Sequence, residues 1–60
     1  MLNVGDSVSL VERWGEVAAG AVGQVAALYS RPTGREVVVE FPTMAVMIPE
    51  RVLRPAVAAE

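Results

Sequence analysis

Residues 20–41, GAVGQVAALYSRPTGREVVVEF, decide the fold that this sequence predicts. Near the end of the stretch, Val37, Val39 and Phe41 alternate with Glu and Val, which is the pattern of a half-buried strand. Segment 31–35 before it holds a Pro that fixes one turn dihedral and a Gly that allows a positive φ two residues later. The stretch therefore predicts a β-hairpin.

The first arm of this hairpin, Val22 to Tyr29, fits either a strand or a helix. From Val17 to Tyr29 the apolar residues recur at helical spacing and would give an amphipathic helix its buried stripe. Gly20 and Gly23 argue against the helix, because each Gly costs about 1 kcal/mol relative to Ala inside a helix. No capping side chain precedes Glu16 either. We expect a strand, with the helix as the alternative.

The flanking segments also have the composition of strands and turns. We expect a first strand at about 7–11 after a bend at Gly5 and Asp6, and a fourth strand at 44–48. A single helical turn at 49–51, with Pro at its first position, precedes a last strand at 52–54. The expected core consists of Val4, Val8, Leu10, Val22, Val25, Leu28, Val37, Val39, Phe41, Val46, Ile48 and Leu53.

Three motifs in order carry a resemblance to a known fold: the start Val4–Val8, the Gly-x-Val-Gly-x-Val of Gly20–Val25, and the end Ile48–Pro55. Together they resemble KOW-like and related SH3-like barrels, and above all short bacterial families of this shape that have no assigned function. The resemblance implies an all-β fold, a small SH3-like barrel of about five strands with a single 3-10 turn before the last strand. It covers a domain at 1–55 and leaves 56–60 as a frayed tail.

Apolar residues are more numerous than so small a core needs. The chain has 60 residues, of which 53% are hydrophobic, and its mean hydropathy is +0.44. Such a chain is a single domain with little interior, although many of these residues are Ala. An exposed apolar area often marks a protein interface. We expect some of a set of six residues to face outward or to touch another chain: Val11, Trp14, Val38, Met44, Met47 and Val57.

The sequence therefore predicts a protein-interaction or accessory module, with a protein partner or a homo-oligomer as the contact. Trp14, Val38 and Met47 are the predicted contact residues, with Arg13 and Arg35 at the rim. Trp14 lies in the long segment between the first two strands, where small scaffolds often carry function. It has two readings, because it could cap the core or could anchor a partner.

The chain is not expected to be an enzyme, and no catalytic, cofactor or metal site is predicted. It has no His to act as general base for Ser7, Ser9 or Ser30. Its carboxylates are spread over turns and outward strand positions, and the usual His and Cys ligands of zinc are absent. Gly20 and Gly23 do not form a phosphate loop, because the chain has no Lys.

A KOW-like RNA- or ribosome-associated role is the alternative function. It would use Tyr29 as a stacking platform beside Arg31 and Arg35. The net charge of −2 and the pI of about 4.9 argue against it, since proteins that follow phosphates cluster Lys and Arg. Nucleic acid is therefore not the expected partner.

Composition also suggests a cytoplasmic location and a bacterial source. The longest uncharged run, Val17 to Ser30, is shorter than the about 20 apolar residues that a membrane-spanning helix needs. The chain has no Cys, and its start does not have the pattern of a secretory signal. The use of Arg alone among the basic residues, with much Ala and Val, suggests a bacterial genome rich in G and C.

Overall fold

The computed structural model describes residues 2–56. They form one five-stranded antiparallel sheet in the order β4-β3-β2-β1-β5. Its elements are β1 (Ser7–Leu10), β2 (Val22–Arg31), β3 (Gly34–Glu40), β4 (Ala45–Pro49), the 3-10 turn η1 (Glu50–Val52) and β5 (Leu53–Pro55). The predictions of an all-β fold, of five strands and of one 3-10 turn before the last strand are confirmed. The helix alternative for Val17 to Tyr29 is wrong.

The sheet is not closed into a barrel, although the resemblance implies closure. Strands β4 and β5 are the two ends of the sheet and do not pair within residues 2–56. The backbone groups on the outer side of β5 do not favour a further strand. The Leu53 N–H donates to the Glu50 carbonyl, and Pro55 has no N–H. Strand β5 therefore offers no backbone donor to a further strand.

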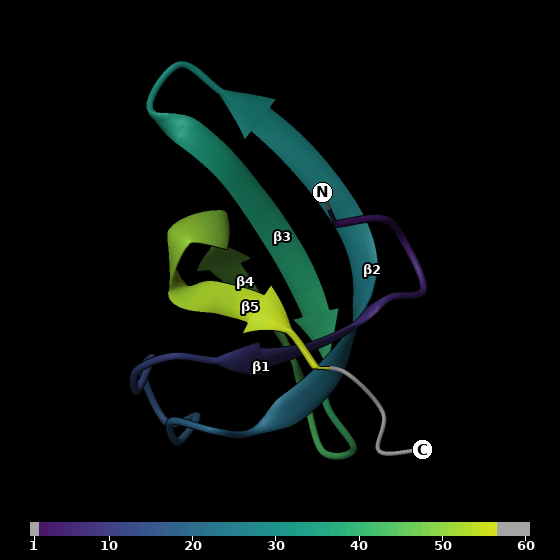
Figure 1. Ribbon diagram of the computed structural model, residues 1–60, viewed down its shortest axis with the longest axis vertical. Coiled ribbons are helices and arrows are strands. Elements are labelled where there is room, and N and C mark those ends of the chain that lie inside the picture. Colours follow the sequence, from purple (N-terminus) through teal and green to yellow (C-terminus); the bar gives the residue numbers. More distant parts are fainter. Residues whose placement is uncertain (1, 57–60) are drawn as a thin grey trace.

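A β-bulge in the longest strand, β2, lets the open sheet fold over on itself. Val25 pairs with Val39 and Ala27 pairs with Val38, so that Ala26 is an extra residue without a partner on β3. Bulges of this kind bend a strand and increase its twist. Figure 1 shows β2 curving along one side of the molecule, with β1, η1 and β5 in front of the fainter β4.

The two halves of the folded sheet bury one apolar core between them. Its buried members are Leu2, Val8, Leu10, Val17, Val25, Val37, Val39, Ile48, Val52 and Leu53, with Trp14, Ala21, Leu28, Phe41 and Val46 packed against them. Two residues of the predicted core are wrong, since Val4 is 64% exposed and Val22 is 55% exposed. Val4 lies in the turn before β1, and Val22 is on the outer side of β2, opposite to the buried Gly23.

The turns follow the local chemistry of their residues. In the β2–β3 hairpin, Arg31 pairs with Gly34, and Gly34 takes the predicted positive φ of 136°. In the long β1–β2 connection, Trp14 and Val17 exchange two backbone hydrogen bonds around Gly15 and Glu16. Gly15 has a φ of 60° and Glu16 does not have a positive φ, which matches a type II′ turn.

The described chain remains paired beyond the predicted end of the domain at residue 55. The Ala56 N–H donates to the Ser7 carbonyl at 2.9 Å and so extends the β1–β5 ladder. The rest of the predicted tail, 57–60, lies outside the described residues.

Gly23 in β2 lies close to the backbone of β3. A Cβ placed there would lie 2.7 Å from the Glu40 carbonyl oxygen, 2.7 Å from Val39 Cγ1 and 2.9 Å from Phe41 Cδ1. The carbonyl belongs to the backbone of β3 and cannot rotate away. The φ of Gly23 is not positive, so its backbone conformation does not require a Gly. This second Gly of the Gly-x-Val-Gly motif is required because there is no space for a side chain.

We expect Gly23→Ala to lower the free energy of unfolding by about 1–3 kcal/mol, the usual cost of overpacking. For a domain of this size, Tm falls by about 4–8 °C for each kcal/mol, which thermal unfolding followed by circular dichroism would measure. Gln24→Ala is the control, because it truncates an exposed side chain on the next residue and should stay within about 0.5 kcal/mol. Equal Tm values for the two variants would contradict the close approach.

Candidate functional site

Two of the predicted contact residues, Val38 and Met47, are direct cross-strand neighbours. They pair between β3 and β4, and Ala27 of β2 pairs with Val38 on its other side. Because Val37 and Val39 are fully buried, Val38 between them must face the opposite side of the sheet. Ala27, Val38 and Met47 thus form an apolar line across three strands on the outer face, which we call the outer row.

The outer row becomes more exposed toward the end of the sheet. Ala27 and Val38 are half-buried, whereas Met47 on β4 is 42% exposed. Along β3, Glu36 and Glu40 lie on either side of the row, while every residue of β4 is uncharged. On the outer face, the apolar outer row thus runs between two acidic side chains of β3. It reaches the edge of the sheet at β4, which has no charged residue.

Trp14 and Arg13 lie in the β1–β2 connection and do not join the outer row. Trp14 is half-buried and packs against the core cluster, which lies on the inner side of the sheet. The Arg13 Nε donates to the Gly15 carbonyl at 3.0 Å and so helps to hold the small turn at 14–17. Trp14 therefore covers part of the core and keeps part of its ring accessible.

Tyr29 and Arg31 lie on one face of the β2–β3 hairpin near its tip, and Arg35 lies on the opposite face. Arg31 Nε lies 2.8 Å from Glu36 Oε1. Arg35 Nη1 lies 3.8 Å from Glu50 Oε2 of η1. Tyr29 is 47% exposed and stands opposite Glu36. Each arginine of the alternative RNA site thus has a carboxylate partner within ion-pair distance.

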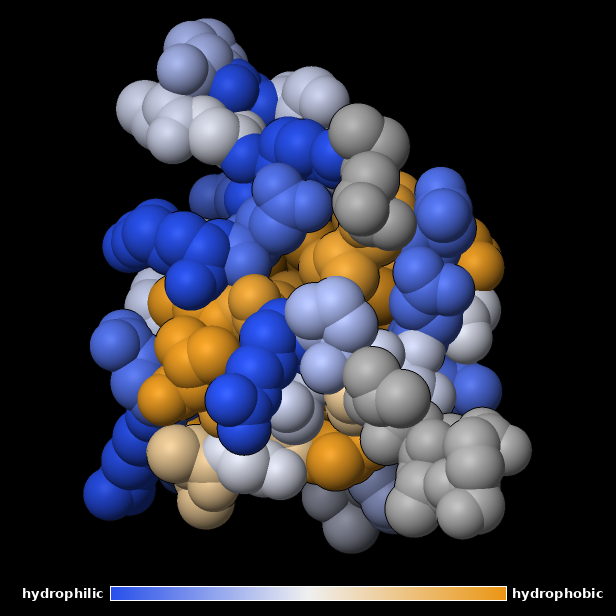
Figure 2. Space-filling view, viewed as in Figure 1, coloured by the Kyte–Doolittle hydropathy of each residue, from blue (hydrophilic) through white to orange (hydrophobic). Residues whose placement is uncertain are grey.

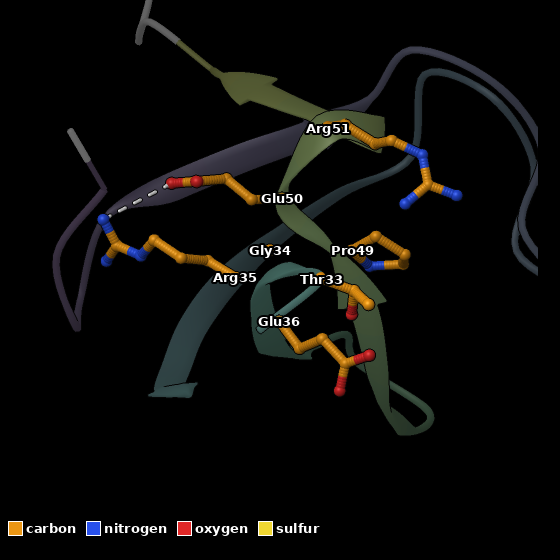
Figure 3. Close-up of a pocket in the computed structure, with 7 residues that line it drawn as sticks. All are labelled: Thr33, Gly34, Arg35, Glu36, Pro49, Glu50 and Arg51. Atoms are coloured by element: carbon orange, nitrogen blue, oxygen red, sulfur yellow. Dashed lines mark ion pairs between the residues drawn. The ribbon is translucent and has the colours of Figure 1, made fainter. Parts of the chain in front are cut away.

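A groove of about 260 Å³ lies between the hairpin tip and η1. Figure 3 shows Arg35 and Glu50 pointing toward one another, with Arg51 extending in the opposite direction. The groove is lined by Thr33, Gly34, Arg35, Glu36, Pro49, Glu50 and Arg51. Two arginines and two glutamates leave the lining without a net charge, so that it attracts neither anions nor cations strongly.

A second groove, not anticipated from the sequence, lies where the long connection meets the β3–β4 turn. It has a volume of about 270 Å³, and among its lining residues Val22 is 55% exposed and Met44 is 42% exposed, with Phe41 and Pro42 between. A signal for it was present in the sequence: Val22 and Val25 are three residues apart, and period-2 alternation puts such residues on opposite faces of a strand.

The exposed apolar residues of the described chain come from several different segments. The large ones are Val4, Val11, Val22, Tyr29, Met44 and Met47. Figure 2 shows one face of the molecule, on which apolar areas are separated by charged and polar side chains. Val38 and Trp14 are half-buried, and Val57 lies outside the described residues.

Within residues 2–56 no three acidic side chains come together as ligands for a metal ion. The described residues also contain no helix with the length and apolar character needed to cross a membrane. Comparisons of the chain with protein-family models, with curated proteins and with solved structures found no match.

We expect Trp14→Ala to lower the free energy of unfolding by about 1–3 kcal/mol, less than the 3–5 kcal/mol typical of a fully buried Trp, because Trp14 is half-buried. Trp14→Phe should lower the free energy of unfolding by less, since it keeps an aromatic ring on the core. Val11→Ala, at a site that is 49% exposed, is the control. Chemical denaturation followed by circular dichroism gives all three values. Unchanged stability of Trp14→Ala would mean that the ring does not support the core.

Proposed function

We propose that this chain is a non-catalytic module that acts by binding another protein chain through the outer row and the adjacent edge of β4. One observation carries the proposal: Val38 and Met47 are cross-strand neighbours on the face opposite to the core, and Met47 is 42% exposed there. Apolar cross-strand pairs stabilise a sheet, and removing their exposed apolar area from water by contact with another chain adds to this. Here the edge of the sheet leaves Met47 with solvent on one side.

The chemistry of the described residues supports binding over catalysis. A protein interface needs apolar side chains at its centre and polar groups at its rim. The outer row supplies the centre, and Glu36 and Glu40 supply a rim on the same face. The other predicted contact residues, Trp14, Arg13 and Arg35, lie away from this face, so that the proposal rests on Val38 and Met47.

Contact with RNA through Tyr29, Arg31 and Arg35 has less support. A phosphate would have to compete with Glu36 for Arg31 and with Glu50 for Arg35. The net charge of −2 also repels the phosphate groups of a nucleic acid. For these reasons we propose a protein partner and not nucleic acid.

We also propose that the chain is an SH3-like, KOW-like domain of a bacterial cytoplasm. Five antiparallel strands with a 3-10 turn before the last one support the resemblance that the three sequence motifs suggest. Small secreted domains of this size commonly depend on disulfides, and this chain has no Cys. The use of Arg as its basic residue supports the bacterial source.

A photo-crosslinking amino acid at position 47 tests the proposed contact. In cells that naturally express the chain, Met47→benzoylphenylalanine should form protein adducts, because the side chain at this position lies in the interface. Val4→benzoylphenylalanine is the control: the site is more exposed, at 64% against 42%, but lies before β1. The mass of each adduct separates a second copy, at twice 6.4 kDa, from a different protein. Equal or absent adducts at the two positions would contradict the proposal.

A further inference from the structure

We propose that the partner at this edge is a second copy of the chain, joined strand to strand through β4 about a twofold axis at Met47. This inference rests on the proposed function and names its partner. It follows from the backbone groups that the two edges of the sheet present, and from the symmetry of the β4 sequence.

The first step is the direction of the backbone groups of β4. The Phe41 N–H donates to the Met44 carbonyl at 2.7 Å, which makes this pair a hydrogen-bonded one. Hydrogen-bonded and non-hydrogen-bonded pairs alternate in an antiparallel ladder. Val46 and Ile48 are then bonded to β3, while Ala45, Met47 and Pro49 direct their backbone groups outward. Pro49 fits this phase, because a residue without an N–H cannot take part in a bonded pair with Glu36.

The second step is the difference between the two edges. Strand β5 has no outward donor, as its Leu53 N–H is used by Glu50 and Pro55 has none, and its middle residue is the charged Arg54. Short length, charge and proline are the usual protections of an edge strand. Strand β4 is longer and uncharged, with a Pro only at its end. Within residues 2–56, no bond to another element uses the N–H of Ala45 or Met47.

The third step is that β4 is complementary to itself. An antiparallel pair centred on Met47 overlaps the whole strand, so that Ala45 lies opposite Pro49 of the second copy and Val46 lies opposite Ile48 of the second copy. The two Met47 residues exchange both of their backbone bonds. Each Ala45 N–H then donates to the carbonyl of Pro49 in the other copy. The carbonyl is the only backbone hydrogen-bonding group of a proline. An interface of this type is isologous and closes on itself.

The fourth step is the side chains that the pairing brings together. The outer row of one copy continues into the outer row of the other, so that Met47 of each copy covers the exposed flank of its counterpart. Glu40 and Glu36 of the second copy are then separated by three strand spacings, about 14 Å. This distance exceeds the screening length of about 8 Å at physiological salt. The acidic rim therefore does not oppose the pairing.

Sedimentation velocity of the full chain over a concentration series up to the millimolar range tests this inference. We expect the mass to rise from 6.4 kDa toward twice that value. Met47→Lys should weaken association by about tenfold or more, because it places two like charges directly opposite one another. Val11→Lys is the matched control: it adds the same charge at an exposed site outside β4 and should associate as the unchanged chain does.

Ala45→Pro is a second variant, which tests the backbone bonds directly. It removes an N–H that the single chain does not use, at the first residue of an edge strand, where Pro is accepted. We expect circular dichroism like that of the unchanged chain and association weakened by about tenfold. Amide hydrogen exchange adds a readout that needs no variant. The Met47 amide should become protected as the concentration rises, while the Val46 amide is protected throughout.

A chain that remains a monomer at every concentration, or equal association of Met47→Lys and Val11→Lys, would overturn the second copy as partner. The proposed function would survive this result if the crosslinker at position 47 captured a different protein. It would fail together with the inference if position 47 captured nothing.

Discussion

The structure depends on one constraint: a single sheet must cover both sides of its own core. The central strand, β2, meets this constraint because it bends at Ala26. Its first residues pair with β1, its residues from Gln24 onward pair with β3, and the unpaired Ala26 interrupts the β3 pairing just after the point where both strands meet β2. The fully buried Val8 and Leu10 from one half of the sheet therefore lie over Val37, Val39 and Ile48 from the other half.

The same bend explains what the sequence predicts and what it hides. The strand at Glu36–Glu40 follows simple alternation, so its place in the hairpin and its buried valines can be read directly. In β2 the bulge inserts one residue between Val25 and Leu28, which both face inward but stand three residues apart. This spacing matches one turn of a helix, and it is why the same segment also fits a helical stripe.

Burial is hardest to predict from the sequence for residues outside the regular strands. Leu2, Val17 and Val52 are buried although they lie in the N-terminal segment, the long connection and the 3-10 turn. Their burial depends on where these segments cross the open ends of the folded sheet, and no periodicity encodes that. The alternation along each strand predicts that Val38 and Met47 face away from the core, whereas their pairing and the distance of Trp14 from them depend on the register of β4 and the path of the connection.

The open sheet also connects the fold to the proposed function. A closed barrel has no edges, but this sheet has two, and the chain protects them differently. Strand β5 lacks outward donors, while β4 keeps the donors of Ala45 and Met47 beside an apolar face. The bend that buries the core thus leaves one uncharged edge available for another chain.

The thermal stability of a chain that lacks Ala26 tests the central claim most directly. Deleting this residue makes the pairing of β2 with β3 regular and leaves Val25, Ala27 and Leu28 on their present faces, so that the bend is the feature removed. The account predicts that the shortened chain loses the cooperative unfolding transition, because its two halves no longer close on one core. A transition at the Tm of the full chain would show that the bulge is not what folds the sheet over, and would contradict the account.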